Sequence, residues 1–291
     1  MLPAKRDVYK RQLWYDAKLF EAEGVKVPET WDEMVDAAVK LNKDGRYGMT
    51  LRIINDDAGW RTFDFYPFVW SAGGDIFDAE AKKSLFDSPE VLSALELYKE
   101  MADAGVLNIN PSRSEDDLGI LCEGETAMQI TGSWACSTYE DYLEDGYDIE
   151  LGVVPFPVPD VGGSPATAAG GWSVAINSKT KHPQEVTDVM FWGFAKETKY
   201  LVERYGDISF AYPTRDSVLQ AAGDIYTEGL RSVSTNEIFG TEHGELRLPA
   251  EGLQYVADAI QSVSYGGDAE EAQKTAHEGL QTFLNEFDGL I

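Results

Sequence analysis

The segment Glu123–Ala135, with the sequence EGETAMQITGSWA, constrains the fold of this chain more than any other stretch. Gly124 ends an apolar helical run, and the AMQI residues that follow predict a short strand. A Gly-Ser pair then turns the chain, and Trp134 begins the next helix with Ser133 as its candidate N-cap. A strand that ends in a small-residue turn commonly presents an aromatic ring at the rim of a cleft. We therefore expect a strand–turn–helix unit with Trp134 near a binding surface.

Short apolar strands alternate with amphipathic helices along the rest of the chain. Further strands are predicted at 13–15, 47–51, 151–154 and 170–176. Helices are predicted at about 18–23, 30–42, 60–70, 89–104, 114–122, 183–194, 253–263 and 268–287, with shorter ones from 198 and from 213. Capping boxes at Thr30/Glu33 and Asp268/Glu271 mark two helix starts. Strands interleaved with helices predict an α/β sheet that is covered by helices on both faces.

Composition narrows the class of protein. The chain has 291 residues, 43% of them hydrophobic, and lacks any run of the roughly 18–20 apolar residues that a membrane span needs. The net charge of −27 repels phosphate backbones, so nucleic acid is not expected as a partner. Solubility is the simplest explanation of this acidity.

Sequence signals for catalysis or metal binding are weak. The chain has three histidines and lacks the HExxH, GxSxG, GxxxxGK[ST] and GxGxxG motifs, so we expect neither an enzyme nor a cofactor or metal site. Cys122 and Cys136 flank the central strand without CxxC or metal-ligand spacing. They form either a disulfide or, as we expect, two buried free thiols.

Three motifs resemble one known family. Residues 13–41 read LWYDAKLFEAEGVKVPETWDEMVDAAVKL, and residues 70–77 read WSAGGDIF. These runs, with GETAMQITGSWA in the central segment, are similar to the patterns LYYNKDLFEKAGL..PPKTWDEL..AAKKL, WSNGGDLF and GxAAMxxxGSWA. They are typical of family 1 extracellular solute-binding proteins, the sugar receptors of ATP-binding cassette (ABC) importers, to which maltose-binding protein is related.

The resemblance implies a type II periplasmic-binding-protein-like α/β fold with two lobes. Here it implies one nearly complete lobe plus a fragment of the other, because about a hundred residues of a first lobe precede the 13–41 motif in the family. The C-terminal-type lobe comprises 13–157 and 212–291, and the N-terminal-type fragment comprises 170–207. The segments 158–169, which is rich in proline and glycine, and 208–211 are the expected crossings between lobes.

Residues 1–12 do not fit this pattern. The run DVYKRQ resembles the translation of a sequencing-library adapter, and the family-like sequence starts at Leu13. We therefore expect 1–12 to be non-native and the chain to be truncated at its N-terminus, so the missing signal peptide carries no information on location.

A sugar offers an apolar C–H face and a fringe of hydroxyls, so its site needs flat aromatic rings and fixed polar groups. Four tryptophans in apolar patterns are expected in the core: Trp14, Trp31, Trp70 and Trp192. Trp60, Trp134 and Trp172 follow polar or glycine-containing turns, which is typical of the rim of a cleft. From the resemblance, the expected ligand-binding residues are Trp60, Arg61, Asp64, Asp75, Trp134, Gly171, Trp172, Arg247 and Tyr255. The alternative role for Asp75 is to cap the passage from a helix into a loop.

The resemblance implies a monomeric receptor that binds a carbohydrate between two lobes and delivers it to membrane permease subunits. Its expected location is extracellular, as a cell-surface lipoprotein or periplasmic protein. A truncated chain is expected to bind sugar weakly. A secreted glycan-active enzyme, with paired carboxylates beside Trp134, and a non-catalytic carbohydrate- or surface-binding module are the alternatives. The sequence leaves the sugar open, and a peptide, a polyol or another polar solute is compatible with it.

Overall fold

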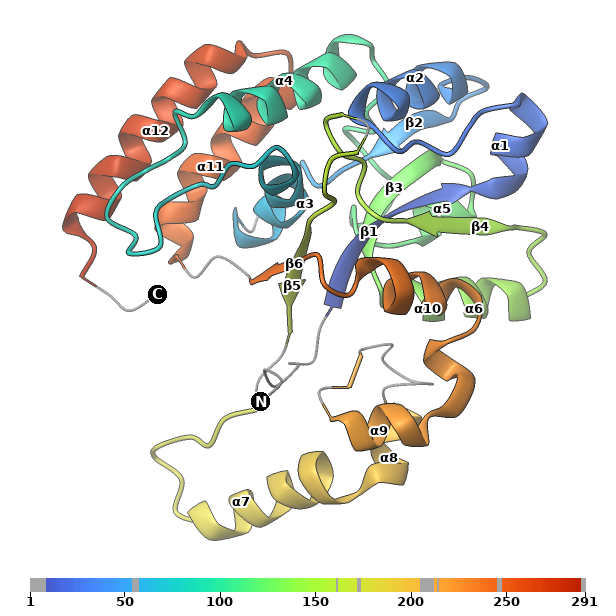
Figure 1. Cartoon of the computed structure of the whole chain (residues 1–291), viewed down its shortest axis with the longest axis vertical. Helices are drawn as coiled ribbons and strands as arrows, with labels where there is room; N and C mark the ends of the chain where they lie inside the picture. Colours follow the sequence, from blue (N-terminus) through green and yellow to red (C-terminus); the bar gives the residue numbers. More distant parts are fainter. Residues whose placement is uncertain are drawn as a thin grey trace.

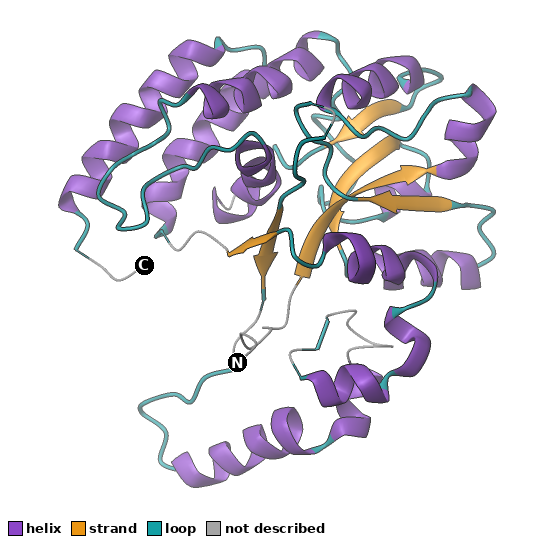
Figure 2. Ribbon diagram, in the orientation of Figure 1, coloured by secondary structure: helices purple, strands orange, loops and turns teal. Residues whose placement is uncertain are grey.

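The computed structural model describes residues 9–53, 58–160, 162–171, 174–204, 212–213, 215–244 and 248–288. Its centre is a mixed six-stranded sheet with a group of long helices beside it (Figures 1 and 2). The strands are β1 (Tyr9–Asp16), β2 (Tyr47–Thr50), β3 (Thr126–Gly132), β4 (Leu151–Val154), β5 (Thr167–Gly170) and β6 (Glu242–Gly244).

Strand β1 organises the sheet. The strand order is β2-β3-β1-β5-β6, and β4 also pairs with β1. β3 lies antiparallel on one edge of β1, with Arg11 opposite Gly132 and Tyr15 opposite Met128. The other edge of β1 is shared, because β4 pairs with its C-terminal half and β5 with Tyr9 and Lys10. β2 and β6 extend the sheet as parallel neighbours of β3 and β5.

Helices cover both faces of this sheet, as the alternating pattern predicted. Leu13 joins the main core and its neighbour Trp14 joins a second, smaller core, because successive side chains of a strand point to opposite faces. The main core is built with α2 (Trp31–Leu41), α3 (Ala58–Ser71), α4 (Pro89–Asp103), α11 (Ala250–Ser264) and α12 (Ala269–Glu286). The smaller core uses α5 (Gly119–Cys122) and α6 (Ala135–Glu144). The short helix α1 (Ala17–Glu23) follows β1 directly.

Local signals place several helix ends where they were predicted. The Thr30 hydroxyl accepts a hydrogen bond from the Glu33 amide, and the Glu33 carboxylate accepts one from the Thr30 amide, so this capping box is confirmed. The Asp268 carboxylate accepts from the Glu271 amide at the start of α12. Gly24 ends α1 in the left-handed conformation, with φ of 59°.

Three local predictions are wrong. Ser133 does not cap α6: Trp134 occupies the N-cap position, and no side chain caps this helix end. The helix predicted at 114–122 shortens to α5, because residues 115–117 bind the sheet instead. The strand predicted at 170–176 ends at Gly170, and residues 174–176 belong to no strand.

The first residues of β1 come from the segment predicted to be non-native. Residues 1–8 lie outside the described part of the chain, whereas Lys10, Arg11 and Gln12 are buried in β1. The Lys10 ammonium lies 2.6 Å from the Glu242 carboxylate and 3.2 Å from the centre of the Phe239 ring. The sheet therefore accommodates 9–12, and the foreign origin of 1–12 stays a prediction.

The segment α7 (Pro183–Phe191), a π-helical turn at Trp192–Lys196 and α8 (Thr198–Glu203) lies apart from the sheet and its covering helices (Figure 1). α7 has no buried residue. Trp14, Trp31 and Trp70 are buried as predicted, but Trp192 is 51% exposed, which corrects its assignment to the core. The helical face that carries Trp192 is apolar, but the described parts of the chain do not cover it. The spacing of apolar residues along a helix cannot reveal whether another surface packs on that face.

We predict that this exposed segment is much less stable than the main core. Amides of α7 and α8 should exchange with deuterium far faster than those of α11, because few buried contacts oppose their local opening. Hydrogen exchange followed by mass spectrometry tests this directly. Equal protection in α7 and α11 would contradict the structure.

The two cysteines are free thiols. Both Cys122 and Cys136 are buried, as expected from the absence of metal-ligand spacing. Burial raises the pKa of each thiol to about 12.

These thiols should resist modification in the folded protein. Because the thiolate is the reactive form, Ellman's reagent at pH 8 should react slowly with the native protein. After denaturation in urea it should label two thiols per chain. Fewer than two reactive thiols after unfolding without reductant would indicate a disulfide.

Candidate functional site

Two of the predicted rim tryptophans are joined by a short chain of contacts. Trp60, in the first turn of α3, is 36% exposed, and its ring centre lies 5.6 Å from that of Phe63. The Arg11 guanidinium lies 5.2 Å from the Phe63 ring and 5.3 Å from the Trp134 ring. We call Trp60, Phe63 and Trp134 the aromatic rim. Phe63 and Trp134, which are 71 positions apart in the sequence, therefore meet across the Arg11 side chain.

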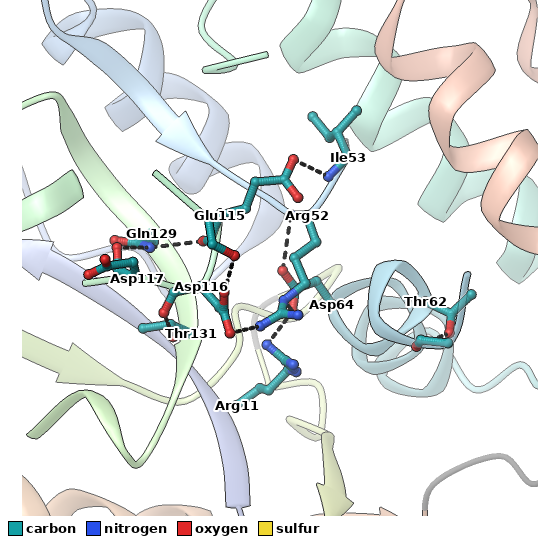
Figure 3. Close-up of polar contacts among 12 residues, drawn as sticks. Arg11, Arg52, Ile53, Thr62, Asp64, Glu115, Asp116, Asp117, Gln129 and Thr131 are labelled. Carbon is teal, nitrogen blue, oxygen red and sulfur yellow. Dashed lines mark hydrogen bonds and ion pairs between the residues drawn. The ribbon is translucent and has the colours of Figure 1, made fainter. Parts of the chain in front are cut away.

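A buried ionic network supports this rim (Figure 3). Asp64, which is fully buried, lies 2.9 Å from an Arg11 nitrogen and 4.0 Å from the Arg52 Nε. Its carboxylate also accepts a hydrogen bond of 3.1 Å from the Arg52 amide. Arg52 reaches Asp116 at 2.8 Å, and its guanidinium lies 5.1 Å from the Trp60 ring centre. The two arginines thus contact all three residues of the aromatic rim, Trp60, Phe63 and Trp134.

Strand β3 holds the acidic part of this network in place. Gln129 donates to the carbonyl oxygens of Glu115 and Asp117, and Thr131 donates to that of Asp116 (Figure 3). Gln129 and Thr131 are two residues apart, so both side chains leave the same face of β3. The Glu115 carboxylate in turn accepts a hydrogen bond of 2.6 Å from the Ile53 amide, just after β2.

Burial and pairing act against each other on the charges of the network. Burial raises the pKa of Asp64 despite the neighbouring Arg11 and Arg52 charges. Burial also lowers the pKa of Arg11 to about 10, although Asp64 opposes this shift. At Asp116 burial favours the neutral acid, but the Arg52 charge and several hydrogen bonds outweigh it and lower the pKa. Arg11, Arg52 and Asp64 are almost completely removed from water. Their ion pairs offset the free-energy cost of burying these charges.

Three other predicted ligand residues make contacts within the scaffold. Arg61 is 5% exposed and donates to the Ala257 carbonyl oxygen of α11. Asp64 belongs to the buried network, so its carboxylate faces arginines rather than solvent. Asp75 accepts from its neighbour's amide and from the Trp70 indole, which is the alternative capping role.

Of the remaining predicted positions, the structure describes Gly171 and Tyr255. Gly171 is exposed just after β5, and the Tyr255 ring packs where a side chain on Gly279 of α12 would lie. Trp172 and Arg247 lie outside the described residues, so the predicted meeting of three indole rings is tested for Trp60 and Trp134 alone.

Arg11, Arg52, Phe63 and Asp116 are not among the site residues that the sequence predicts. Arg52 directly follows a predicted strand, and Phe63 lies one helical turn from Trp60. These two positions in the sequence could have indicated that Arg52 and Phe63 lie near Trp60. Arg11 was set aside because it falls within the segment predicted to be non-native.

The described residues contain no group of three His, Cys, Asp or Glu side chains that could hold a metal ion. Across these same ranges, every helix is too short or too polar to cross a membrane. The Asp64 carboxylate forms an ion pair with Arg11, and the Asp116 carboxylate forms one with Arg52.

Comparison with known proteins identifies the family. The family described as "Bacterial extracellular solute-binding protein" matches residues 3–200, which is more than half of the 291-residue chain. The protein belongs to this family of bacterial extracellular solute-binding proteins, as its sequence motifs indicated.

Curated relatives match over part of their length. The multiple sugar-binding protein of Streptococcus mutans is 24% identical over 185 residues, or 60% of this chain and 42% of the relative. The putative ABC transporter periplasmic-binding protein YcjN of Escherichia coli is 30% identical over 91 residues, or 31% of this chain and 20% of the relative. The chain spans less than half the length of these curated relatives.

Solved structures confirm the predicted type II binding-protein fold. A solute-binding protein from Thermotoga lettingae bound with α-D-tagatose has a TM-score of 0.80 at 24% identity, over 96% of this chain and 71% of that one. Maltose-bound T. maritima MalE3 has a TM-score of 0.78 at 23% identity, over 96% of this chain and 72% of that one.

The ionic network predicts a large stability penalty at Asp64. Asp64→Asn should lower the free energy of unfolding by about 3–5 kcal/mol, because it leaves two buried arginines without their shared anion. Urea unfolding followed by circular dichroism measures the loss.

Asp148→Asn is the matched control. Its side chain is 95% exposed and pairs with Lys18 at the surface, so the same change should cost less than about 0.5 kcal/mol. Similar losses for the two variants would show that the buried network does not hold α3 in place.

Proposed function

We propose that this protein is the ligand-binding component of an ABC importer and that its aromatic rim binds a carbohydrate. The observation that carries this proposal is that Phe63, which contacts Trp60, and Trp134 both lie over the guanidinium of Arg11, which is buried with Asp64. Exposed rings suit the C–H face of a sugar, and a rigid support reduces the entropy lost when the ligand binds.

Relatives and structural neighbours support this ligand class. Their names include a multiple sugar-binding protein and binding proteins in complex with maltose and tagatose. Others in the same fold are complexed with ribitol or glycerophosphocholine, so a polyol belongs among the ligands to be tested. In this role the protein is monomeric, extracellular or periplasmic, passes its ligand to permease subunits, and needs no cofactor.

The packing of the chain supports a division into two lobes. Residues of 13–168 and 248–284 share the main core, whereas no residue of α7 or α8 belongs to it. We assign the α7–α8 region, within 170–207, to the other lobe. Tyr212 and Tyr226 form a small cluster with Val202 of α8, and Leu230 is the next residue to pack beside the sheet. The crossing predicted at 208–211 lies outside the described residues, and we place the return to the main lobe just before Leu230.

The rim predicts weak but measurable carbohydrate binding. Because Trp60, Phe63 and Trp134 are the part of the proposed site that the structure describes, the expected dissociation constant is about 1 mM, or roughly −4 kcal/mol. Isothermal titration calorimetry with maltose, tagatose, ribitol and malto-, galacto- and xylo-oligosaccharides should identify one binder. Trp134→Ala should abolish that binding.

Trp192→Ala is the control, since it removes an indole that is more exposed than Trp134 but lies in the separate helical segment. It should leave the affinity unchanged. Binding that survives Trp134→Ala, or no binding by any ligand, would refute the proposal. Release of new reducing ends from the oligosaccharides would favour the alternative of a glycan-active enzyme.

A further inference from the structure

Gly132, the last residue of β3, lies directly beneath the Trp134 ring. A Cβ atom built on Gly132 would lie 1.9 Å from Cζ3 of Trp134 and 2.3 Å from its Cε3 and Cη2. Gly132 is not among the glycines with positive φ, so its backbone conformation does not require glycine. What requires glycine here is space, because the six-membered ring of the indole occupies the volume that any side chain would need.

The strand pairing adds a second neighbour to this ring. Gly132 faces Arg11 across the β1–β3 ladder, and the Arg11 guanidinium lies 5.3 Å from the Trp134 ring centre. Trp134 therefore lies across the two paired strands at the point where one has no side chain. The ring is half-buried, so it is supported from below while part of it reaches solvent.

We propose that Gly132 is a positioning residue, whose missing side chain fixes the orientation of Trp134 for stacking on a carbohydrate. This inference rests on the proposed function of the rim. A half-exposed indole can turn into solvent, and ordering it again on binding would weaken affinity. Seating the ring on the strand backbone fixes it before the ligand arrives.

The same chain contains a similar pair elsewhere in the sheet. A Cβ atom on Gly152 would lie 2.1 Å from Cζ of Tyr15, which is its partner across the β1–β4 ladder. A ring packed over a strand glycine also stabilises sheets in general. A substitution at Gly152 is therefore a control that shows the effect on stability of displacing a ring from a strand glycine away from the rim.

A double-mutant cycle tests the positioning without ligand. Gly132→Ala should lower the urea midpoint of the parent protein, since the methyl group displaces the ring. In a Trp134→Ala background the same change should leave the midpoint unchanged or raise it, because alanine is favoured over glycine in a strand. Equal destabilisation in both backgrounds would overturn the inference. If Gly132→Ala alone does not fold, recovery of folding in the double variant would support the inference.

Affinity then tests the link to function. Gly132→Ala should weaken binding of the carbohydrate found by calorimetry by about tenfold or more, comparable to loss of a stacked ring. Gly152→Ala should lower the urea midpoint and leave affinity within about twofold, since Tyr15 lies outside the rim. Unchanged affinity in Gly132→Ala would refute the positioning role. Absence of binding by the parent would instead refute the proposed function, and the cycle would still decide whether Gly132 orients Trp134.

Discussion

The buried carboxylate of Asp64 is the interaction on which the candidate site depends. Asp64 joins α3 to β1 through Arg11 and to the end of β2 through Arg52, and all three side chains are almost completely removed from solvent. Charges at such depth are tolerated when they are paired, so the three elements cannot separate without exposing or orphaning a charge. The rings of Phe63 and Trp134 then pack on the Arg11 guanidinium that this pairing holds still.

This arrangement explains why the rim is formed by residues from distant parts of the chain. Trp60 comes from a helix and Trp134 from the turn after a strand. Of the arginines between them, Arg11 comes from β1 and Arg52 from the loop just after β2. Each has a rigid element behind it, and rigid support favours binding because less freedom is lost when a ligand arrives. The acidic residues 115–117 complete the support because Gln129 and Thr131 fix their backbone to the sheet.

The segment with α7 and α8 illustrates the opposite situation. Its sequence has the apolar spacing of a covered helix, yet Phe191 and Trp192 are more than half exposed. Local periodicity reports that a face is suited to burial, whereas burial itself requires a partner surface. Within the described residues that surface is not supplied, and the same chain therefore combines a well-packed core with an apolar helical face in contact with solvent.

The sequence by itself determined the alternation of strands and helices, the Thr30/Glu33 capping box, the burial of Trp14, Trp31 and Trp70, and the family. These properties are encoded locally, in hydrophobic spacing, caps and contiguous motifs. Tertiary structure alone decided that Asp64 faces two arginines, that Asp75 caps a loop, and that Trp134 rests on Gly132. Such contacts depend on which strands pair and in what register, and pairing between distant segments is a property of the whole fold rather than of any stretch of the chain.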